Sequence, residues 1–284
     1  MLVIKLKSGI NLFNIRHPSC FAKNILKKYF FVKRVIVLCI GFAKLKKLVE
    51  GVKALSFFEE LKDTLIENGA ALVGFADLHD VTPYSELPYG ISIGFALDPE
   101  IISGITDGPT HEYARLYDHA NRSLWSLGAL AEEMILSKGG RVKNLPSTID
   151  KVPENLRTAL PHKTVATKSG LGWIGKCALL ITKEYGSALR FTSLLTDLPL
   201  PVGEPITESR CGECRACLKA CPVTAPSGKN WNSSFEREDF FNVWKCYEKT
   251  KIEASRPEIG KLICGMCIAA CPYTKAYIKR SGAK

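Results

Sequence analysis

Eight of the eleven cysteines in this 284-residue chain lie between residues 211 and 271. They form a first run with the spacing C-x2-C-x2-C-x3-C-P, then one separate cysteine, then a second run with the spacing C-x2-C-x3-C-P. In order, the positions are Cys211, Cys214, Cys217, Cys221, Cys246, Cys264, Cys267 and Cys271. The first spacing is that of bacterial ferredoxins, in which three close thiolates bind one 4Fe-4S cluster and the fourth binds another. The cysteines therefore predict iron-sulfur chemistry.

Counting ligands assigns the eight thiols to two 4Fe-4S clusters. The second run supplies only the last three positions of the pattern, and Cys246 is available for the missing one. The first thiol set is then Cys211, Cys214, Cys217 and Cys271, and the second thiol set is Cys221, Cys246, Cys264 and Cys267. Structural zinc is the competing interpretation, since C-x2-C pairs also form tetrahedral thiolate sites. Zinc requires neither a third cysteine at this spacing nor a proline after the last one, so the pattern favours iron.

Two interlocked clusters suit a relay of single electrons, which leaves two main hypotheses for function. In the first, the chain is an oxidoreductase whose clusters reduce a cofactor or substrate held elsewhere in the chain. In the second, it is a non-catalytic, ferredoxin-like carrier that reduces a partner protein. A redox-sensing or RNA-binding module is a third interpretation. The other cysteines, Cys20, Cys39 and Cys177, are assigned no role, because free cysteine is commonly a small buried apolar residue.

The composition, with 46% hydrophobic and 24% charged residues, excludes a disordered or fibrous protein. The formal net charge of +11 is concentrated in the first 50 residues, so the remainder is nearly neutral. The apolar run at 35–43 is shorter than the roughly 20 residues of a membrane-spanning helix, and lysines follow it where a signal peptide would be cleaved. We therefore expect a cytoplasmic protein with reduced thiols.

Residues 1–50 form a basic extension without clear capping or turn signals. A membrane-surface or RNA-binding arm is one interpretation of this segment. The favoured interpretation is a poorly packed extension, disordered or produced by an upstream start site.

The sequence predicts two domains that position the cysteines and the cofactor or substrate. Residues 51–203 mix helical and strand patterns, which indicates an α+β domain for a cofactor or substrate, and residues 204–284 form the cysteine-rich domain. Helices are expected to begin near Ser56 and near Asp107, and each ends at glycine. Strands are expected at 70–75, 90–96 and 141–145, and in a hairpin that pairs 177–182 with 188–195.

A glycine-rich motif precedes the predicted hairpin. Gly170, Gly172 and Gly175 have the G-x-G-x-x-G spacing of dinucleotide-binding turns. Those turns need a strand before and a helix after, whereas here a helical stretch precedes and a hairpin follows, so a dinucleotide site is disfavoured. Glycines at this density allow a close approach of the backbone to another group. Trp173 and Lys176 add a flat apolar surface and a cation, and a tight turn around a core tryptophan is the structural alternative.

Three features of this sequence resemble the epoxyqueuosine reductase family. They are the stretch H-K-T-V-A-T-K-S-G-L-G-W-I-G-K-C-A-L-L-I-T-K-E-Y-G-S at 162–187, the T-D-L-P-L at 196–200 and the order of the eight cysteines. The resemblance implies a nitroreductase-like α/β sandwich domain, shared with reductive dehalogenases, followed by a bacterial ferredoxin-like domain. It implies two 4Fe-4S clusters and cobalamin as cofactors, and removal of the epoxide oxygen in the last step of queuosine synthesis in tRNA. It also implies an electron donor of the ferredoxin or flavodoxin type.

The resemblance also assigns residues. It gives the same two thiol sets as the count, and it places four residues of the glycine motif near the corrinoid: Gly170, Gly172, Trp173 and Lys176. The family's proton-donating aspartate falls on Leu156 in this chain. Asp150 and His162 are the candidate replacements, because a histidine can carry a proton near neutral pH. Tyr117-Asp118-His119 loosely matches a D-Y-H motif of the family.

Positive charge gathers around the motif, because residues 141–176 hold seven Lys or Arg against two acidic residues. Such a patch can contact RNA phosphates, form a solvated rim, or bind the anionic groups of a cofactor. The sequence leaves these three roles open.

Overall fold

The computed structural model describes residues 57–81, 84–148 and 152–283. The basic extension, with Cys20 and Cys39, and the candidate acid Asp150 lie outside the described residues. The described residues fall in one compact unit, Leu55–Lys284. The domain boundary expected at residue 203 therefore stays a prediction.

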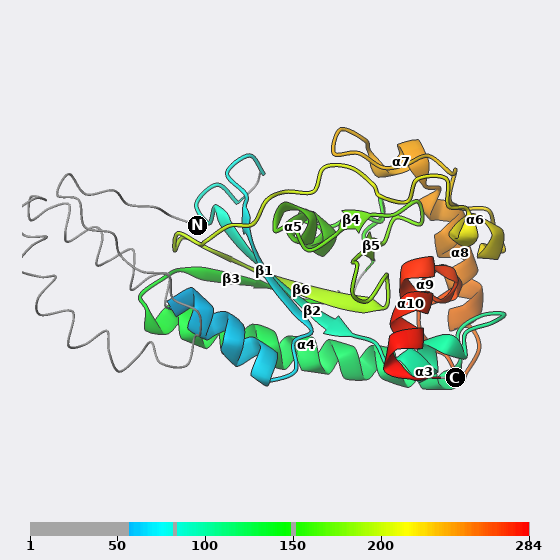
Figure 1. Ribbon diagram of the computed structural model, residues 1–284, viewed down its shortest axis with the longest axis horizontal. Helices are drawn as coiled ribbons and strands as arrows, with labels where there is room; N and C mark the ends of the chain where they lie inside the picture. The colour runs from blue at the N-terminus through cyan, green and yellow to red at the C-terminus, as the bar shows by residue number, and fades with distance from the viewer. Residues whose placement is uncertain (1–56, 82–83, 149–151, 284) are drawn as a thin grey trace, which may run out of the picture. The chain divides into compact units, whose positions relative to one another are not determined.

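A four-stranded antiparallel sheet with the order β1-β2-β6-β3 forms the centre of this unit (Figure 1). Its strands are β1 (Leu72–Asp77), β2 (Tyr89–Ala96), β6 (Leu189–Thr196) and β3 (Val142–Leu145). The strands at 72–77, 89–96 and 142–145 confirm the expected ones to within about two residues. Ile91 and Ile93 are fully buried in β2, which lies between β1 and β6.

Helices cover both faces of the sheet. A helix over residues 57–67 and the long helix α4 (His111–Ser137) pack on one face, where Leu61, Leu124 and Ile93 belong to one apolar cluster. The other face carries α5 (His162–Lys168), whose Val165 packs with Leu195 of β6. The first two helices were expected from the apolar periodicity, and α5 lies in the stretch expected to be helical before the glycine motif. The result is a helix-sheet-helix arrangement that leads into the cysteine-rich segment.

The expected hairpin of 177–182 with 188–195 is wrong. The short strand β5 (Leu180–Ile181) pairs with β4 (Trp173–Ile174), while the residues after 188 enter the large sheet as β6. Gly172 permits the β4 to β5 pairing, because a Cβ at this position would lie 2.2 Å from the carbonyl oxygen of Ile181. The sequence could not reveal this, since both alternatives bury the same apolar run.

The cysteine-rich segment contains five short helices. They are α6 (Ala216–Ala220), α7 (Arg237–Phe240), α8 (Val243–Ala254), α9 (Met266–Ala270) and α10 (Pro272–Ser281). Helices α6 and α9 each begin inside a C-x2-C pair, end at the next cysteine and pack against each other. The two cysteine runs therefore meet through equivalent helices.

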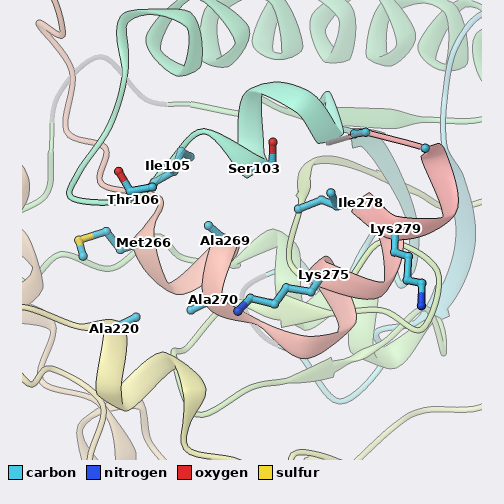
Figure 2. A pocket seen from close by; sticks show the side chains of 12 residues that line it. Ser103, Ile105, Thr106, Ala220, Met266, Ala269, Ala270, Lys275, Ile278 and Lys279 are labelled. Atoms are coloured by element: carbon cyan, nitrogen blue, oxygen red, sulfur yellow. The ribbon is translucent and has the colours of Figure 1, made fainter.

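Helix α10 returns from this segment to the rest of the unit. The amide of Ser187 donates to Thr274 Oγ1 at 3.1 Å, and the Tyr277 hydroxyl donates to the Leu97 carbonyl at 3.1 Å. Together with α6, α9 and α3 (Pro99–Ser103), α10 borders an open groove of about 640 Å³ (Figure 2). Lys275 and Lys279 lie at this groove, and no cysteine lines it.

Gly172→Ala tests the close approach of β4 and β5. We expect the free energy of unfolding to fall by about 1–3 kcal/mol, because the new methyl group must displace backbone rather than a flexible side chain. Gly104→Ala is the matched control, since its Cβ would make an ordinary 3.5 Å contact. Equal stability of the two variants in urea unfolding would contradict the pairing.

Candidate metal centre and active site

Four thiols surround one cavity of about 300 Å³. Cys211, Cys214 and Cys217 come from the loop around α6, and Cys271 comes from the end of α9. These are the members of the first thiol set. The cavity lies against Tyr273, whose ring packs edge-on against Trp173 at 5.1 Å between ring centroids.

The second thiol set gathers next to α8. Cys246 on α8 and Cys264 and Cys267 around the start of α9 line a different cavity, of about 460 Å³, called here the central cavity. Burial raises the pKa of Cys246 to about 11, and the charges of Cys264 and Cys221 act in the same direction. All four members of the second set are therefore neighbours, although Cys221 does not line the central cavity.

The thiols surround spaces and do not converge on a point. Among the residues described, no three or more His, Cys, Asp or Glu side chains are arranged to ligate a single metal ion. Tetrahedral zinc needs its sulfur ligands at about 2.3 Å from one centre.

A cation and a thiol from the glycine motif lie against the two sets. Lys176 is only 4% exposed, and its Nζ donates to the carbonyls of Gly212 at 2.6 Å and Cys214 at 3.1 Å. The buried Cys177 thiol is within hydrogen-bonding reach of Cys217 from the first set and Cys267 from the second. Sequence reasoning left Cys177 without a role, because nothing in its spacing shows that it lies between the sets.

The predicted corrinoid residues have other neighbours. Gly170, Gly172 and Trp173 line a separate pocket of about 440 Å³, and Lys176 lines the cavity of the first thiol set, so none of the four lines the central cavity. Trp173 is 1% exposed and belongs to the core. A Cβ at Gly170 would lie 2.7 Å from the Glu204 carbonyl oxygen. The glycines thus allow a close approach of chain segments, and their place near a corrinoid stays a prediction.

His162 lines the central cavity, but both of its ring nitrogens face protein atoms. Nε2 is 3.0 Å from the Pro146 carbonyl oxygen, and Nδ1 is 3.0 Å from Ser193 Oγ. Because a carbonyl only accepts, Nε2 carries the proton and Nδ1 accepts from the Ser193 hydroxyl. Burial lowers the pKa of His162, so the ring is neutral at pH 7. The Nε2 proton of His162 is thus used in a hydrogen bond to the Pro146 carbonyl.

Sequence reasoning missed the role of other cavity residues. Lys163 and Arg190 line the central cavity, together with Tyr113 and Tyr117. The tyrosines occur in the long apolar stripe of α4, so periodicity alone marks them as core. His119 of the D-Y-H-like motif instead packs against Phe95, with 5.6 Å between ring centroids, and does not line the central cavity.

Three of the seven cations in the positive patch at 141–176 form ion pairs with carboxylates. Arg141 pairs with Asp197 at 2.8 Å, Lys168 pairs with Asp80 at 2.7 Å, and Arg157 pairs with Glu236 and Glu238. The Lys143 Nζ lies 4.8 Å from the centroid of the Tyr84 ring, and Lys151 lies outside the described residues. The ion pairs thus neutralise part of the patch, and the three roles predicted for it stay open.

Comparison with known proteins gives consistent relatives, although no family model matches the chain. The epoxyqueuosine reductase of Vibrio cholerae is 35% identical over 123 residues, which are 40% of this chain and 31% of that protein. The epoxyqueuosine reductase of Aliivibrio fischeri is 48% identical over 64 residues, which are 22% of this chain and 17% of that protein.

The resemblance to epoxyqueuosine reductases is confirmed. The chain spans only about a third or less of the length of these reductases. Solved structures add the fold: an epoxyqueuosine reductase matches with a TM-score of 0.55 and 21% identity over 79% of this chain and 67% of its own. Another, determined with an epoxyqueuosine-modified tRNA-Tyr stem loop, gives a TM-score of 0.54 over the same shares, also at 21% identity.

A reductive dehalogenase, whose structure suggests a mechanism for B12-dependent dehalogenation, shares the fold as well. It matches with a TM-score of 0.57 and 17% identity over 75% of this chain and 32% of its own. The mixed α/β architecture is therefore common to both groups. Within the described ranges, no helix combines the length and apolar character needed to cross a bilayer.

The buried, neutral His162 predicts a pH effect on stability. Because burial lowers its pKa below the ordinary value, the unfolded chain takes up a proton at this residue more readily than the folded chain. Stability from this residue is present above about pH 6.5 and is lost as the pH falls below it. We expect the melting midpoint of wild type to fall more between pH 7.5 and 5.5 than that of His162→Gln. His111→Gln, at an exposed site, should retain the wild-type difference; a wild-type pH response in His162→Gln would contradict the assignment.

Proposed function

We propose that this chain is an iron-sulfur oxidoreductase of the epoxyqueuosine reductase kind. Two 4Fe-4S clusters, held by the first and second thiol sets, pass single electrons to a corrinoid or a substrate in the central cavity. The substrate-binding part is a nitroreductase-like domain at 51–203, and the clusters are held by a ferredoxin-like domain at 204–284. The enzyme is proposed to act in the cytoplasm.

One observation carries this proposal: three thiols of the second set line the same cavity as His162, Lys163 and Arg190. A carrier that only docks to partner proteins needs no internal cavity beside its cluster. The shared cavity places a bound molecule beside the thiols that are proposed to hold the cluster. The position of Cys177, within reach of a thiol from each set, supports a short distance between the two proposed clusters.

The residues present fit both kinds of cofactor. Four thiols around a 300 Å³ space suit a cubane cluster better than a single ion. The central cavity has extended apolar walls that include Leu97, Leu179 and Phe191, which suit a flat macrocycle. A corrinoid bound there would supply a reduced cobalt able to deliver electrons to the substrate.

Reduction of an epoxide to an alkene consumes two electrons and two protons, and the oxygen leaves as water. The electrons come one at a time from an external donor of the ferredoxin or flavodoxin type, through the clusters. The protein must exclude water and position the substrate. The Nε2–H group of His162 donates a hydrogen bond to the Pro146 carbonyl, and this bond fixes the position of the His162 ring in the cavity wall. Asp150 stays a predicted proton donor, and the tRNA stem loop a predicted substrate.

Metal analysis tests the clusters. Anaerobically purified protein should contain about eight irons per chain and absorb broadly in the visible range. Cys211→Ser and Cys246→Ser should each lose about half of the iron, because each removes a ligand of one cluster. Cys177→Ser is the matched control and should keep the full iron content. A colourless protein with stoichiometric zinc would contradict the proposal.

Turnover tests the enzyme against the carrier. With cobalamin, dithionite and tRNA that contains epoxyqueuosine, we expect conversion to the nucleoside lacking one oxygen, measured by mass spectrometry. Cys246→Ser should abolish the conversion, because it damages the cluster next to the central cavity. An iron-loaded protein that binds no cobalt and converts no substrate, yet reduces an added electron carrier, would favour the non-catalytic function.

A further inference from the structure

The open groove bordered by α3, α6, α9 and α10 lies directly beside the cysteine ligands of both thiol sets (Figure 2). Ala220 and Ala270 line this groove, and they directly precede Cys221 and Cys271 in the chain. Cys221 belongs to the second thiol set and Cys271 to the first. An electron that arrives in the groove is therefore one residue of wall away from ligands of either set.

Helix α9 separates this groove from the central cavity. Met266, Ala269 and Ala270 line the groove, whereas Cys267 and Ile268 line the central cavity. Successive residues of a helix are rotated by about 100°, so the first three residues share one face of α9 and the other two lie on the opposite face. A molecule in the groove and a molecule in the central cavity can therefore be bound at the same time.

The groove has an apolar floor and a positive rim. Ile105, Met266 and Ile278 form part of the floor and pack in one apolar cluster. Lys275 and Lys279 extend from α10, and both are exposed (Figure 2). No aspartate or glutamate is among the described residues that line the groove. Its charge is therefore positive.

The two lysines do not stabilise α10 as a pair. They lie four residues apart, where two like charges on a helix repel each other. Lys275 also lies at the end of the first helical turn, where the helix dipole disfavours a cation. Within the part of the chain that the structure describes, neither lysine forms an ion pair that could offset this. The arrangement favours a negatively charged partner from outside the chain.

The location of the groove indicates the kind of partner. A tRNA substrate must reach the central cavity, which lies on the other face of α9. A reductant needs only to come close to the clusters, and the groove allows this without blocking the central cavity. Complexes between redox proteins are small and transient, and opposite charges on the two surfaces speed their formation. An apolar floor inside a positive rim suits such a complex.

We propose that this groove is the docking surface for a small acidic electron-carrier protein that reduces the clusters. The inference rests on the proposed function, because it requires clusters in the two thiol sets. Carboxylates of the carrier pair with Lys275 and Lys279, and its apolar contact surface covers the floor. Each encounter oxidises the carrier by one electron and reduces one cluster by one electron. Two encounters supply the two electrons that the proposed reduction consumes.

Stopped-flow reduction of the anaerobic, iron-loaded protein by a reduced, acidic 2Fe-2S ferredoxin tests the proposal. Lys275→Glu and Lys279→Glu should each lower the second-order rate constant at least about threefold at low salt, because each reverses a charge that attracts the carrier. Added salt should slow wild type and reduce the difference. Lys275→Arg and Lys279→Arg, which keep the charge, should react like wild type.

Lys62→Glu is the matched control, because it makes the same change in net charge at an exposed position on the helix over residues 57–67. This helix lies far from α10 in Figure 1. The control should keep the wild-type rate with ferredoxin. Dithionite, a small reductant that needs no docking surface, should reduce all of these variants equally.

Carbodiimide cross-linking, which joins a carboxylate directly to a lysine, provides a second measurement. Mass spectrometry should find the ferredoxin joined to Lys275 or Lys279. Wild-type rates in the Lys275→Glu/Lys279→Glu double variant, or cross-links only at other lysines, would overturn the proposal. A dimer of this chain that the double variant dissociates, or protection of both lysines by the tRNA stem loop alone, would assign the groove to another occupant and overturn it as well.

Failure of docking is distinguishable from failure of the proposed function. A protein without iron, or one whose iron dithionite does not reduce, contradicts the proposed clusters. A protein that dithionite reduces, and that ferredoxin reduces equally well with and without the two lysines, retains the proposed function and lacks this docking surface.

Discussion

The buried ammonium of Lys176 joins the glycine-rich turn to the first cysteine loop. Its hydrogen bonds to the Gly212 and Cys214 carbonyls fix the backbone on which three thiols are carried. Because Cys177 follows directly, the same contact places a thiol within reach of both cysteine sets. This charged group, satisfied by carbonyl oxygens, thus ties the glycine-rich turn to the candidate metal centre, in addition to the hydrogen bonds of α10.

The features of this structure that depend on residue spacing within one segment could be predicted from the sequence. The spacing of the cysteines separates the eight thiols into two sets, and the apolar periodicity of α4 and the strands follows from burial on one face. The pairing of β4 with β5 could not be predicted, because it depends on the space that Gly172 leaves beside Ile181. The sequence shows that residue 172 is a glycine, but it does not show that Ile181 lies beside it.

The same limit applies to the cavity. His162 was a candidate because histidine titrates near neutral pH, yet its pKa and hydrogen bonds are set by Pro146 and Ser193, which are distant in sequence. Lys163 stood in a run of basic residues with no mark of its own. In the folded chain it lines the central cavity and donates to the Ala178 carbonyl, which depends on contacts distant in sequence. Charge counted along a sequence does not tell which cations are already neutralised.

The position of Cys271 in the first thiol set has a consequence for biogenesis. Three of these thiols leave the ribosome together, but the fourth is synthesised sixty residues after Cys211. At usual translation speeds this interval is roughly 3 to 12 s. During that time the nascent polypeptide carries only three of the four thiols that surround this cavity, so the proposed cluster can be completed only after Cys271 has been made.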